Sequence, residues 1–307
     1  MSSTQLLRIA VALVVLLAAW GGIALWRSRG RDQPARFTPA AALSPAAADR
    51  VEIARGPDTV RLEKRGAQWT VNGFQASEQA VLDFFSALAD TAASSELVAQ
   101  NASSHERMGL DSLKAGRVTV TGGGKTLVDL YLGNRGPDFE GGYLRRVGEP
   151  AVYLLGGRFR DLADRGEDLW RERLIAKVTP DSVATVEVTR GRKRYTLKRG
   201  APWRLSGEGP ADSAAVARLL SQFAELRATG FPTRAQSDSA DFRKAERRVR
   251  LLGPSGMPLL AIALDSSTAG AFWVRADSGG SVYKVDQRLA EMITPAESFL
   301  RGVAGGT

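Results

Sequence analysis

The sequence of 307 residues contains no cysteine and a single histidine, His105. The lack of cysteine excludes disulfides, cysteine nucleophiles and thiolate metal sites, and it says little about the redox compartment. A Ser-His-Asp triad or a multi-histidine zinc site would have to include His105, which lies in the polar stretch NASSHERMGLD without a partner pattern. Because catalysis needs several mutually positioned groups, we expect a protein that is not an enzyme. The sequence predicts no catalytic residue, no cofactor-binding residue and no metal ligand.

Lysine is scarce as well, since it supplies only 8 of the 42 basic residues that give the chain a formal net charge of +9. The densest basic clusters are RGRKRYTLKR at 190–199 and RKAERRVR at 243–250. Both lie beside strand-like alternation, which favours a solvated sheet face with the arginines pointing outward. The alternative is an extracytoplasmic surface that binds an anionic polymer or lipid. No nucleic-acid-binding motif accompanies the charge, so we expect no specific nucleic-acid partner.

The string GGGKT at residues 122–126 resembles the end of a phosphate-binding P-loop. That motif requires a glycine at the position of Thr119 and a helix after the lysine. Instead, apolar and polar residues alternate on both sides of the glycines, in VTVT before them and in VDLYL after them. Alternation of period two is typical of strands, so the sequence predicts a β-hairpin with Gly122 to Gly124 at its turn.

The longest uncharged run is IAVALVVLLAAWGGIALW, the eighteen residues 9–26. At about 1.5 Å per residue, a helix of this length crosses the hydrocarbon core of a bilayer. A cleaved signal peptide is the alternative, but the run is longer than the hydrophobic region of such peptides and no convincing A-x-A site precedes the following basic residues. We therefore predict a short tail at 1–8 and a single-pass anchor at 9–26 that contacts the bilayer. The flanking arginines alone do not decide its orientation.

Residues 27–48 form a proline- and alanine-rich segment that contains Pro34, Pro39 and Pro45. Proline fixes φ and removes a backbone donor, so the sequence predicts an extended, partly stiff tether rather than a folded segment. Such a tether would hold the rest of the chain away from the membrane.

From residue 49 onward the chain carries two copies of one pattern. A period of this length indicates a duplicated domain rather than a solenoid. We predict a first repeat at 49–178, a second at 179–300 and a flexible tail at 301–307. Equivalent residues lie near 130–135 positions apart, namely Trp69 and Trp203, Val81 and Val216, Tyr143 and Trp273, and Tyr153 and Tyr283.

Each repeat has the same predicted plan, which belongs to the α+β class. A helix capped by Ser77, or by Asp212 in the second repeat, has one apolar stripe and must pack on a sheet. The connections are too short for helical crossovers, so the strands are expected to be mostly antiparallel. The predicted strands and closing helix of the first repeat are 50–55, 59–64, 68–72, the hairpin 117–132, 142–147, 151–155 and the helix 159–164. Their later counterparts in the second repeat are the hairpin 248–264, 271–276, 281–285 and the helix 287–293.

Two pairs of residues have both a structural and a functional interpretation. Trp69 and Trp203 each follow a basic-glycine segment, KRGAQW and KRGAPW, which favours a core anchor at the start of a strand. The alternative is an aromatic platform for a sugar or a base. Asp138 and Glu140 form an acidic pair in a glycine-rich loop and are the candidates for an extracytoplasmic enzyme. The second repeat has no equivalent pair, which favours a solvated loop.

The anchor, the tether and two copies of the pattern "L-E-K-R-G-x-x-W…helix…R-V-T-V…L-x-L-G…Y-L-R…V-Y-L" together resemble the bacterial domain of unknown function 4340, over about residues 50–295. This resemblance implies an extracytoplasmic accessory role beside components of gliding-motility-type ABC transporters, and it carries no catalytic residues. It also implies the orientation: the anchor lies in the bacterial inner membrane and residues 49–307 are periplasmic. We therefore expect a non-catalytic, membrane-anchored accessory or scaffold protein whose partner is an ABC transporter component.

Overall fold

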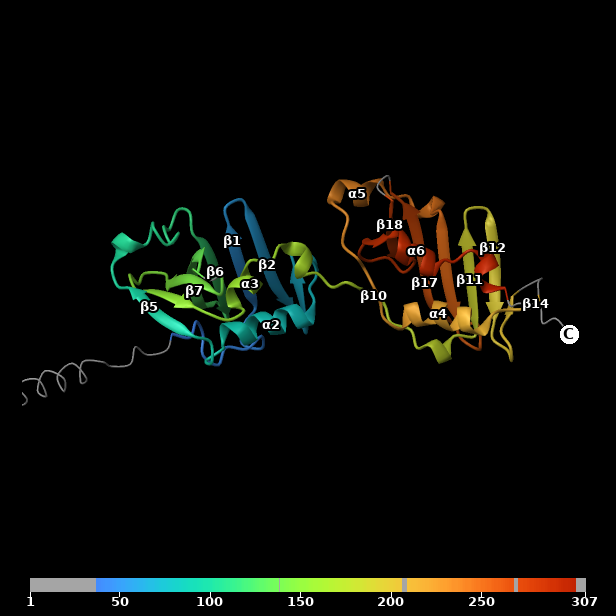
Figure 1. Ribbon diagram of the computed structural model, residues 1–307, viewed down its shortest axis with the longest axis horizontal. Coiled ribbons are helices and arrows are strands. Elements are labelled where there is room, and N and C mark those ends of the chain that lie inside the picture. Colours follow the sequence, from blue (N-terminus) through green and yellow to red (C-terminus); the bar gives the residue numbers. More distant parts are fainter. Residues whose placement is uncertain (1–36, 138, 206–208, 268–269, 302–307) are drawn as a thin grey trace, which may run out of the picture. The chain divides into compact units, whose positions relative to one another are not determined.

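The computed structural model of the protein describes residues 37–137, 139–205, 209–267 and 270–301. The chain divides into two compact units, with the boundary between Glu167 and Asp168. Figure 1 shows that each unit is built around one large sheet with helices packed on it. The predicted anchor at residues 9–26 lies outside the described residues. Within the described ranges, no helix is long and apolar enough to cross a membrane.

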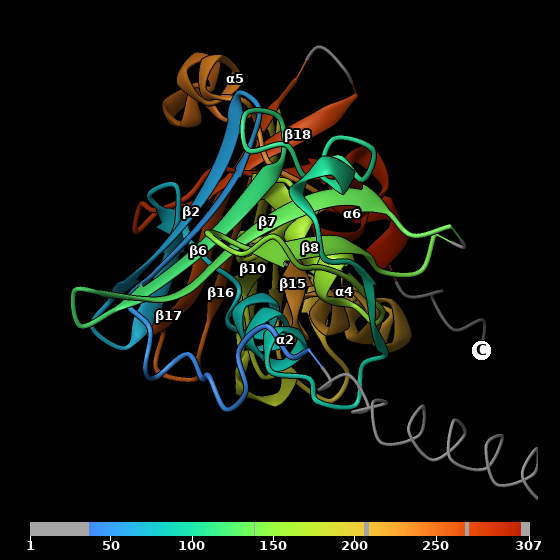
Figure 2. The ribbon, with the colours of Figure 1, turned by 90° about the vertical axis from the view of Figure 1, so that its left-hand side faces the viewer.

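The first unit is a nine-stranded antiparallel sheet in the order β4-β3-β2-β1-β6-β7-β8-β9-β5. Helices α2 and α3 contact each other, and α2 also contacts β3. Figure 2 shows α2 beside the strands of this unit. The elements are β1 (Arg50–Arg55), β2 (Asp58–Arg65), β3 (Gln68–Val71), β4 (Phe74–Gln75), α2 (Glu78–Leu88), β5 (Ser95–Ala99), β6 (Gly116–Gly122), β7 (Lys125–Arg135), β8 (Gly142–Arg146), β9 (Val152–Leu155) and α3 (Phe159–Ala163).

The second unit repeats this topology with an eight-stranded antiparallel sheet in the order β14-β13-β12-β11-β16-β17-β18-β19. A separate two-stranded sheet pairs β10 with β15. The elements are β10 (Leu174–Ala176), β11 (Thr185–Arg190), β12 (Lys193–Lys198), β13 (Arg204–Leu205), β14 (Gly209–Pro210), α4 (Ser213–Ala224), β15 (Leu226–Arg227), α5 (Arg234–Ser239), β16 (Arg247–Leu252), β17 (Pro258–Ser266), β18 (Ala271–Ala276), β19 (Tyr283–Asp286) and α6 (Gln287–Ile293). The predicted α+β class with mostly antiparallel sheets is confirmed.

The long helix of each unit begins where the sequence places its cap. The Ser77 hydroxyl accepts a hydrogen bond from the backbone N–H of Ala80, and the Asp212 carboxylate accepts bonds from Ala214 and Ala215. These side chains satisfy backbone donors that the first helical turn leaves unpaired. The cap therefore fixes the start of each helix, and the apolar stripe that follows faces the sheet.

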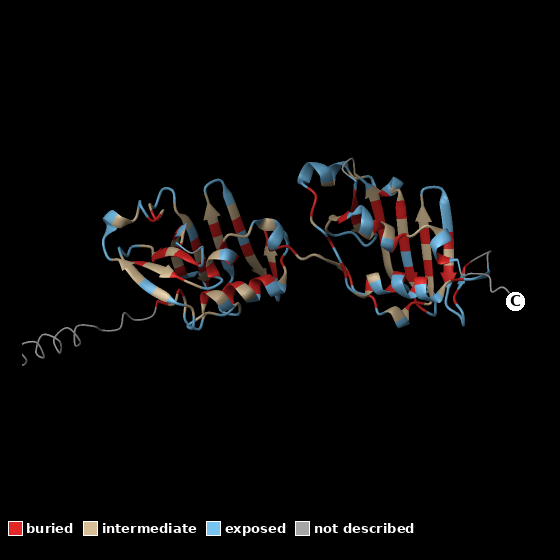
Figure 3. Ribbon diagram, viewed as in Figure 1, coloured by how far each residue is buried: buried red, intermediate tan, exposed pale blue. Residues whose placement is uncertain are grey.

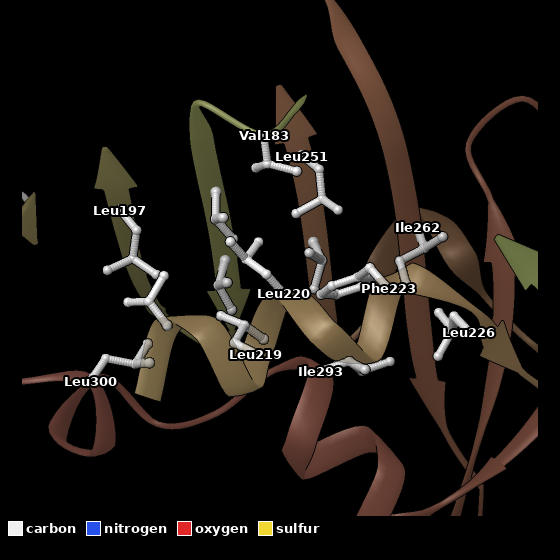
Figure 4. Close-up of a cluster of buried hydrophobic side chains, with 14 of the residues drawn as sticks. Val183, Leu197, Leu219, Leu220, Phe223, Leu226, Leu251, Ile262, Ile293 and Leu300 are labelled. Carbon is white, nitrogen blue, oxygen red and sulfur yellow. The ribbon is translucent and has the colours of Figure 1, made fainter. Parts of the chain in front are cut away.

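The core of each unit lies between the sheet and its helices. In the first unit α2 buries Phe84, Phe85 and Leu88. Burial alternates along most strands, as Figure 3 shows, so that one face of each sheet is apolar. The other face is largely polar, with a small apolar cluster around Met108 in the first unit and around Trp273 in the second. Figure 4 shows the core of the second unit, where Leu219, Leu220 and Phe223 of α4 point toward the strands. Burial of these apolar side chains is the main force that holds the helix on the sheet.

The tether and the unit boundary differ from the sequence-based expectation. Residues 37–48 are not a free spacer, because they pack on the first unit. The ring of Phe37 stacks on Tyr153 with centroids 4.2 Å apart, and the guanidinium of Arg146 lies 5.0 Å from the centroid of Phe37. The boundary lies before residue 178, because β10 pairs with β15 and the backbone N–H of Val178 donates to the carbonyl of Phe223 within the second unit. Composition could not reveal these long-range contacts.

Candidate functional site

The GGGKT segment is the turn of the β6–β7 hairpin, as predicted. Gly122 pairs with Lys125 across the turn, and Gly123 and Gly124 have φ values of +57° and +74°, which glycine adopts readily. The backbone N–H of Gly123 donates to Oδ2 of Asp49 at 2.9 Å. A Cβ on Gly122 would lie 2.1 Å from the carbonyl oxygen of Ala47. The turn therefore binds a carboxylate of its own chain, and its glycines give space to the neighbouring backbone.

The other residues considered for chemistry have structural surroundings or lie apart. Nε2 of His105 lies 2.9 Å from the carbonyl oxygen of Pro150, at the surface of the first unit. Glu140 is exposed, and its predicted companion Asp138 lies outside the described residues. No group of three or more His, Asp or Glu side chains suited to a metal ion occurs in the described part of the chain. The structure brings none of these candidates together.

Both tryptophans belong to the cores. Trp69 is 7% exposed and its ring centroid lies 5.9 Å from that of Phe85 in α2. Trp203 is 8% exposed and belongs to the core of the second unit, with the guanidinium of Arg199 4.9 Å from its ring centroid. A platform for sugars or bases needs an accessible ring face, so burial confirms the interpretation as core anchors.

The basic clusters are only partly outward-facing, which corrects the prediction of a solvated sheet face. Arg247 is 5% exposed and contacts α6: its guanidinium donates to Oε1 of Glu291 at 3.0 Å and to Oγ1 of Thr294 at 3.1 Å. Arg190 donates to the same carboxylate and to the carbonyl of Thr294 at 3.3 Å. Burial alone would raise the pKa of Glu291, but hydrogen bonds from these arginines outweigh it and lower that pKa.

The first unit has the equivalent arrangement around Arg55, which ends β1 as Arg190 ends β11. Arg55 contacts the carboxylate of Asp164 and donates to the carbonyl of Ala163 at the end of α3. Arg135 donates to the same carboxylate at 2.7 Å. Cations at the C-terminal end of a helix bond its free carbonyls and complement its dipole. In both units an arginine at the end of the equivalent strand therefore holds the last helix on the sheet.

A pocket of 390 Å³ lies next to this contact in the first unit. Its lining mixes basic and acidic side chains, including Arg55, Asp58, Asp164 and Glu167. Burial lowers the pKa of Arg55, and Asp164 offsets this in part. Arg55 pairs with Asp164 within this lining, and charges of both signs lie close together, so the pocket has no pronounced preference for an anion or a cation.

Arginines that do not reach the helices lie on the open face of the second sheet, the face without α4 and α6. Strand register places Arg194 beside Thr189 and Thr189 beside Arg248, with Glu187 and Arg250 in the next row. Alternation puts Lys198 and Arg204, which pair directly, on the same face, because their neighbours Leu197 and Leu205 are buried. We call Arg194, Lys198, Arg204, Arg248 and Arg250 the basic face. The two predicted clusters thus contribute to one surface.

On the equivalent face of the first sheet, most of the charged side chains form ion pairs. Its arginines pair with acids on neighbouring strands: Arg50 with Glu63 at 2.8 Å, Arg61 with Glu52 at 3.4 Å and Arg117 with Asp129 at 2.6 Å. A shallow depression of 660 Å³ on this face is lined by several of these residues. Such exposed pairs add little stability, but they cancel each other's field. The two open faces of one duplicated fold therefore differ in charge.

The comparisons with known proteins identify a family. A family model described as "Domain of unknown function (DUF4340)" matches residues 69–243, from β3 of the first unit to the segment before β16 of the second. This stretch is shorter than the residues 50–295 over which the sequence pattern resembles that family. Neither the curated proteins nor the solved structures gave a match.

Proposed function

Since the chain belongs to the DUF4340 family, we propose that it is a membrane-anchored, extracytoplasmic accessory protein that works by binding, with a component of an ABC-type transporter as its partner. The proposal combines the predicted anchor at 9–26 with the role that the family resemblance implies. In this account the two units are a scaffold outside the cytoplasm, held at the inner membrane. In this account the protein binds its partner through its surface and supplies no reacting groups.

The observation that carries the proposal is how each unit uses its polar groups. Arg190 and Arg247 of the basic clusters hold α6 in place, the N–H of Gly123 in the hairpin turn bonds Asp49, and His105 contacts a backbone carbonyl. Each sheet meanwhile keeps much of its second face open, beside a small apolar cluster around Met108 and Leu110 in the first unit and around Phe242 and Trp273 in the second. Broad open faces on a rigid scaffold favour recognition by contact area rather than by a pocket.

A second candidate function is the binding of an anionic polymer or lipid. It is favoured by one observation, the strand register that gathers Arg194, Arg248 and Arg250 on the same open face. Arg250 pairs with Glu187, but the cations of this face outnumber the acids beside them, and such an excess attracts phosphate, sulfate or carboxylate groups. The two candidates are compatible, because an accessory protein at a membrane can contact both its partner and the lipid.

Co-purification from membranes tests the proposed function. The full chain is extracted in mild detergent and the proteins that accompany it are identified, with Lys125→Ala as a parallel variant. We expect a membrane subunit of an ABC transporter with both forms, because Lys125 lies exposed beside a hairpin turn. Recovery without any transporter component, or ATP hydrolysis by the purified chain that Lys125→Ala abolishes, would overturn the proposal.

A further inference from the structure

We propose that the basic face of the second unit is a docking surface for anionic phospholipid headgroups. This inference rests on the proposed function, because the anchor at 9–26 would keep the face within reach of the bilayer. It goes further by assigning the surface to one unit, to one face of that unit and to one chemical class of ligand.

Equivalent positions in the two sheets carry different charges. In the first sheet Arg50 pairs with Glu63, and in the second the same register position pairs Thr185 with Lys198. An acid of the first face is thus a cation on the second.

The pairing of β6 with β7 gives a second difference. There Thr119 lies opposite Asp129, whereas the equivalent pair in the second sheet is Arg250 opposite Ala261. Glu187 remains at the place of Glu52. At these register positions the second face therefore keeps one of three acids. It gains Lys198 and Arg250, while Arg50 and Arg61 of the first face are replaced by Thr185 and Thr196.

Acidic groups neutralise only some of the cations on the basic face. Arg250 shares an ion pair with Glu187 at 3.0 Å. Arg248 donates to the carbonyl of Phe242 and lies 3.6 Å from Asp277. Within the described ranges, Arg194, Lys198 and Arg204 have neither an ion pair nor a side-chain hydrogen bond, and all three are exposed. Their charge is available to a ligand.

The charge of the whole unit points the same way. Residues 168–307 contain 22 basic and 15 acidic residues, a formal net charge of +7. Residues 1–167 contain 20 basic and 18 acidic residues, a net charge of +2. The excess positive charge of the chain is thus concentrated in the unit that carries the basic face. Its field favours approach of an anionic surface to this unit over the other.

The arrangement of the exposed cations favours a lipid over a soluble polyanion or an acidic protein. The exposed cations project from three strands, with the hydroxyls of Thr185, Thr189 and Thr196 on the same face. No partner fixes the side chains of Arg194, Lys198 and Arg204 within the described ranges, which suits laterally mobile headgroups better than a complementary protein surface with fixed positions.

Tethering adds to this preference. Each basic residue near an anionic bilayer contributes about 1 kcal/mol, so a handful of them bind weakly unless an anchor supplies a high effective concentration. An anchor supplies that concentration for the membrane, whereas a soluble polymer would have to bind without it.

The test uses the absence of native cysteine to place one label at a time. The full chain is reconstituted in lipid nanodiscs with a fluorophore at Thr196→Cys on the basic face, or at Thr121→Cys on the first unit's face as a matched control. Discs contain phosphatidylcholine with or without phosphatidylglycerol, and a quencher is attached to headgroups. We expect quenching at Thr196→Cys to increase at least about threefold with anionic lipid and to be lost in about 1 M salt, where the Debye length is about 3 Å. The control should not respond to lipid charge.

A charge-swap variant keeps the test falsifiable. Lys198→Glu with Arg250→Thr gives the second face the residues that the first face carries at those positions, and both positions are exposed. The variant should fold with an unchanged melting temperature and lose the response to anionic lipid, since each cation removed weakens headgroup binding about fivefold. A persistent response in this variant would contradict the inference, as would equal quenching in neutral and anionic discs.

Three further outcomes separate the alternatives. If heparin displaces the basic face from the membrane at a lower concentration of anionic charge than the lipid presents, the face binds a soluble polyanion and the lipid inference is wrong. If quenching occurs only when the transporter subunit is present, the basic face binds a protein and the lipid inference is likewise wrong. Failure of the full chain to enter nanodiscs would instead count against the anchor. Sedimentation of the chain with phosphatidylglycerol vesicles, and not with neutral ones, would then decide the headgroup inference by itself.

Discussion

Arg190 and Glu291 form a two-point ion pair, with Nη1 of the arginine 2.6 Å from Oε2 and Nη2 2.7 Å from Oε1 of the carboxylate. The two residues are 101 positions apart in the sequence, at the end of β11 and within α6. Bidentate geometry is the strongest form of this contact. The pair also orients the carboxylate toward Arg247, whose side chain is only 6% exposed.

Replacing Glu291 should therefore destabilise the second unit. In Glu291→Gln the guanidinium of Arg247 stays buried without its carboxylate, and we expect a loss of about 1–3 kcal/mol in the free energy of unfolding. Glu63→Gln, which breaks the exposed pair with Arg50, is the matched control and should cost less than about 1 kcal/mol. Urea unfolding of the two variants measures both values. Equal losses of unfolding free energy in the two variants would show that the contact of Arg190 and Arg247 with Glu291 stabilises the fold no more than an exposed ion pair.

The same carboxylate predicts a pH dependence. The pKa of Glu291 is lowered in the folded state from an ordinary value of 4.5. A lowered pKa means that the folded state holds the proton less tightly than the unfolded chain. The stabilisation that ionised Glu291 gives to the folded state is thus complete above about pH 4.5, the ordinary pKa of the unfolded chain. It is lost as the pH falls through the lower pKa of Glu291 in the folded state. Unfolding curves of wild type and Glu291→Gln should converge in this acidic range, and a constant difference down to pH 2 would argue against it.

The tryptophans give a third prediction. Trp69→Ala and Trp203→Ala should each cost about 3–5 kcal/mol, because a large buried ring is replaced by a cavity. Leu113→Ala, at a side chain that is 91% exposed, serves as the control and should change stability by less than about 0.5 kcal/mol. Thermal unfolding is the measurement. An unchanged melting temperature combined with loss of a ligand would restore the interpretation as a binding platform.

The hairpin turn gives a fourth prediction. Gly122→Ala should cost about 1–3 kcal/mol, because its Cβ would collide with the backbone at Ala47. Lys125→Ala, three residues further on, should be neutral within about 0.5 kcal/mol. Chemical denaturation compares them. If Lys125→Ala were the more damaging of the two, the structural account of GGGKT would be wrong.

The docked segment before β1 gives a fifth prediction. Phe37→Ala should lower the stability of the first unit by about 2–4 kcal/mol, through loss of the stacked pair with Tyr153 and of its burial. Thr38→Ala leaves the carbonyl that accepts from Arg146 in place and should have little effect. Calorimetry measures the difference. Equal melting temperatures for the wild type and Phe37→Ala would mean that residues 37–48 are a free tether after all.

Much of the fold was predictable, because apolar and polar residues alternate along the hairpin strands and capping residues mark where the long helices begin. The predicted hairpins at 117–132 and 248–264 coincide closely with β6–β7 and β16–β17. The strand β5 was not predicted, because its residues SELVA show no regular alternation of burial. The strands β10 and β15, of three and two residues, are too short for a sequence pattern to predict them. They are defined by their pairing with each other.

The charged faces were predictable in part. Alternation already places Arg190 on the side of Val186 and Val188, which are buried, and Arg194 on the opposite side. Applied residue by residue, this parity would have separated the arginines that hold α6 from those of the basic face. What the sequence could not show is Glu291 as the common partner, because that contact spans the unit. The ion pairing on the first face likewise depends on strand register, which only the fold defines.

The measurement that tests the account most directly is the location of the two units relative to the membrane. The cysteine-free chain allows Thr126→Cys in the β6–β7 hairpin of the first unit and Ser255→Cys in the equivalent β16–β17 connection of the second, both at exposed positions. Intact spheroplasts are treated with a membrane-impermeant maleimide, and the full chain is followed through carbonate extraction of the membranes. The account predicts that both cysteines react without lysis and that the chain stays with the membrane pellet. Labelling only after lysis, or release of the chain into the supernatant, would contradict it.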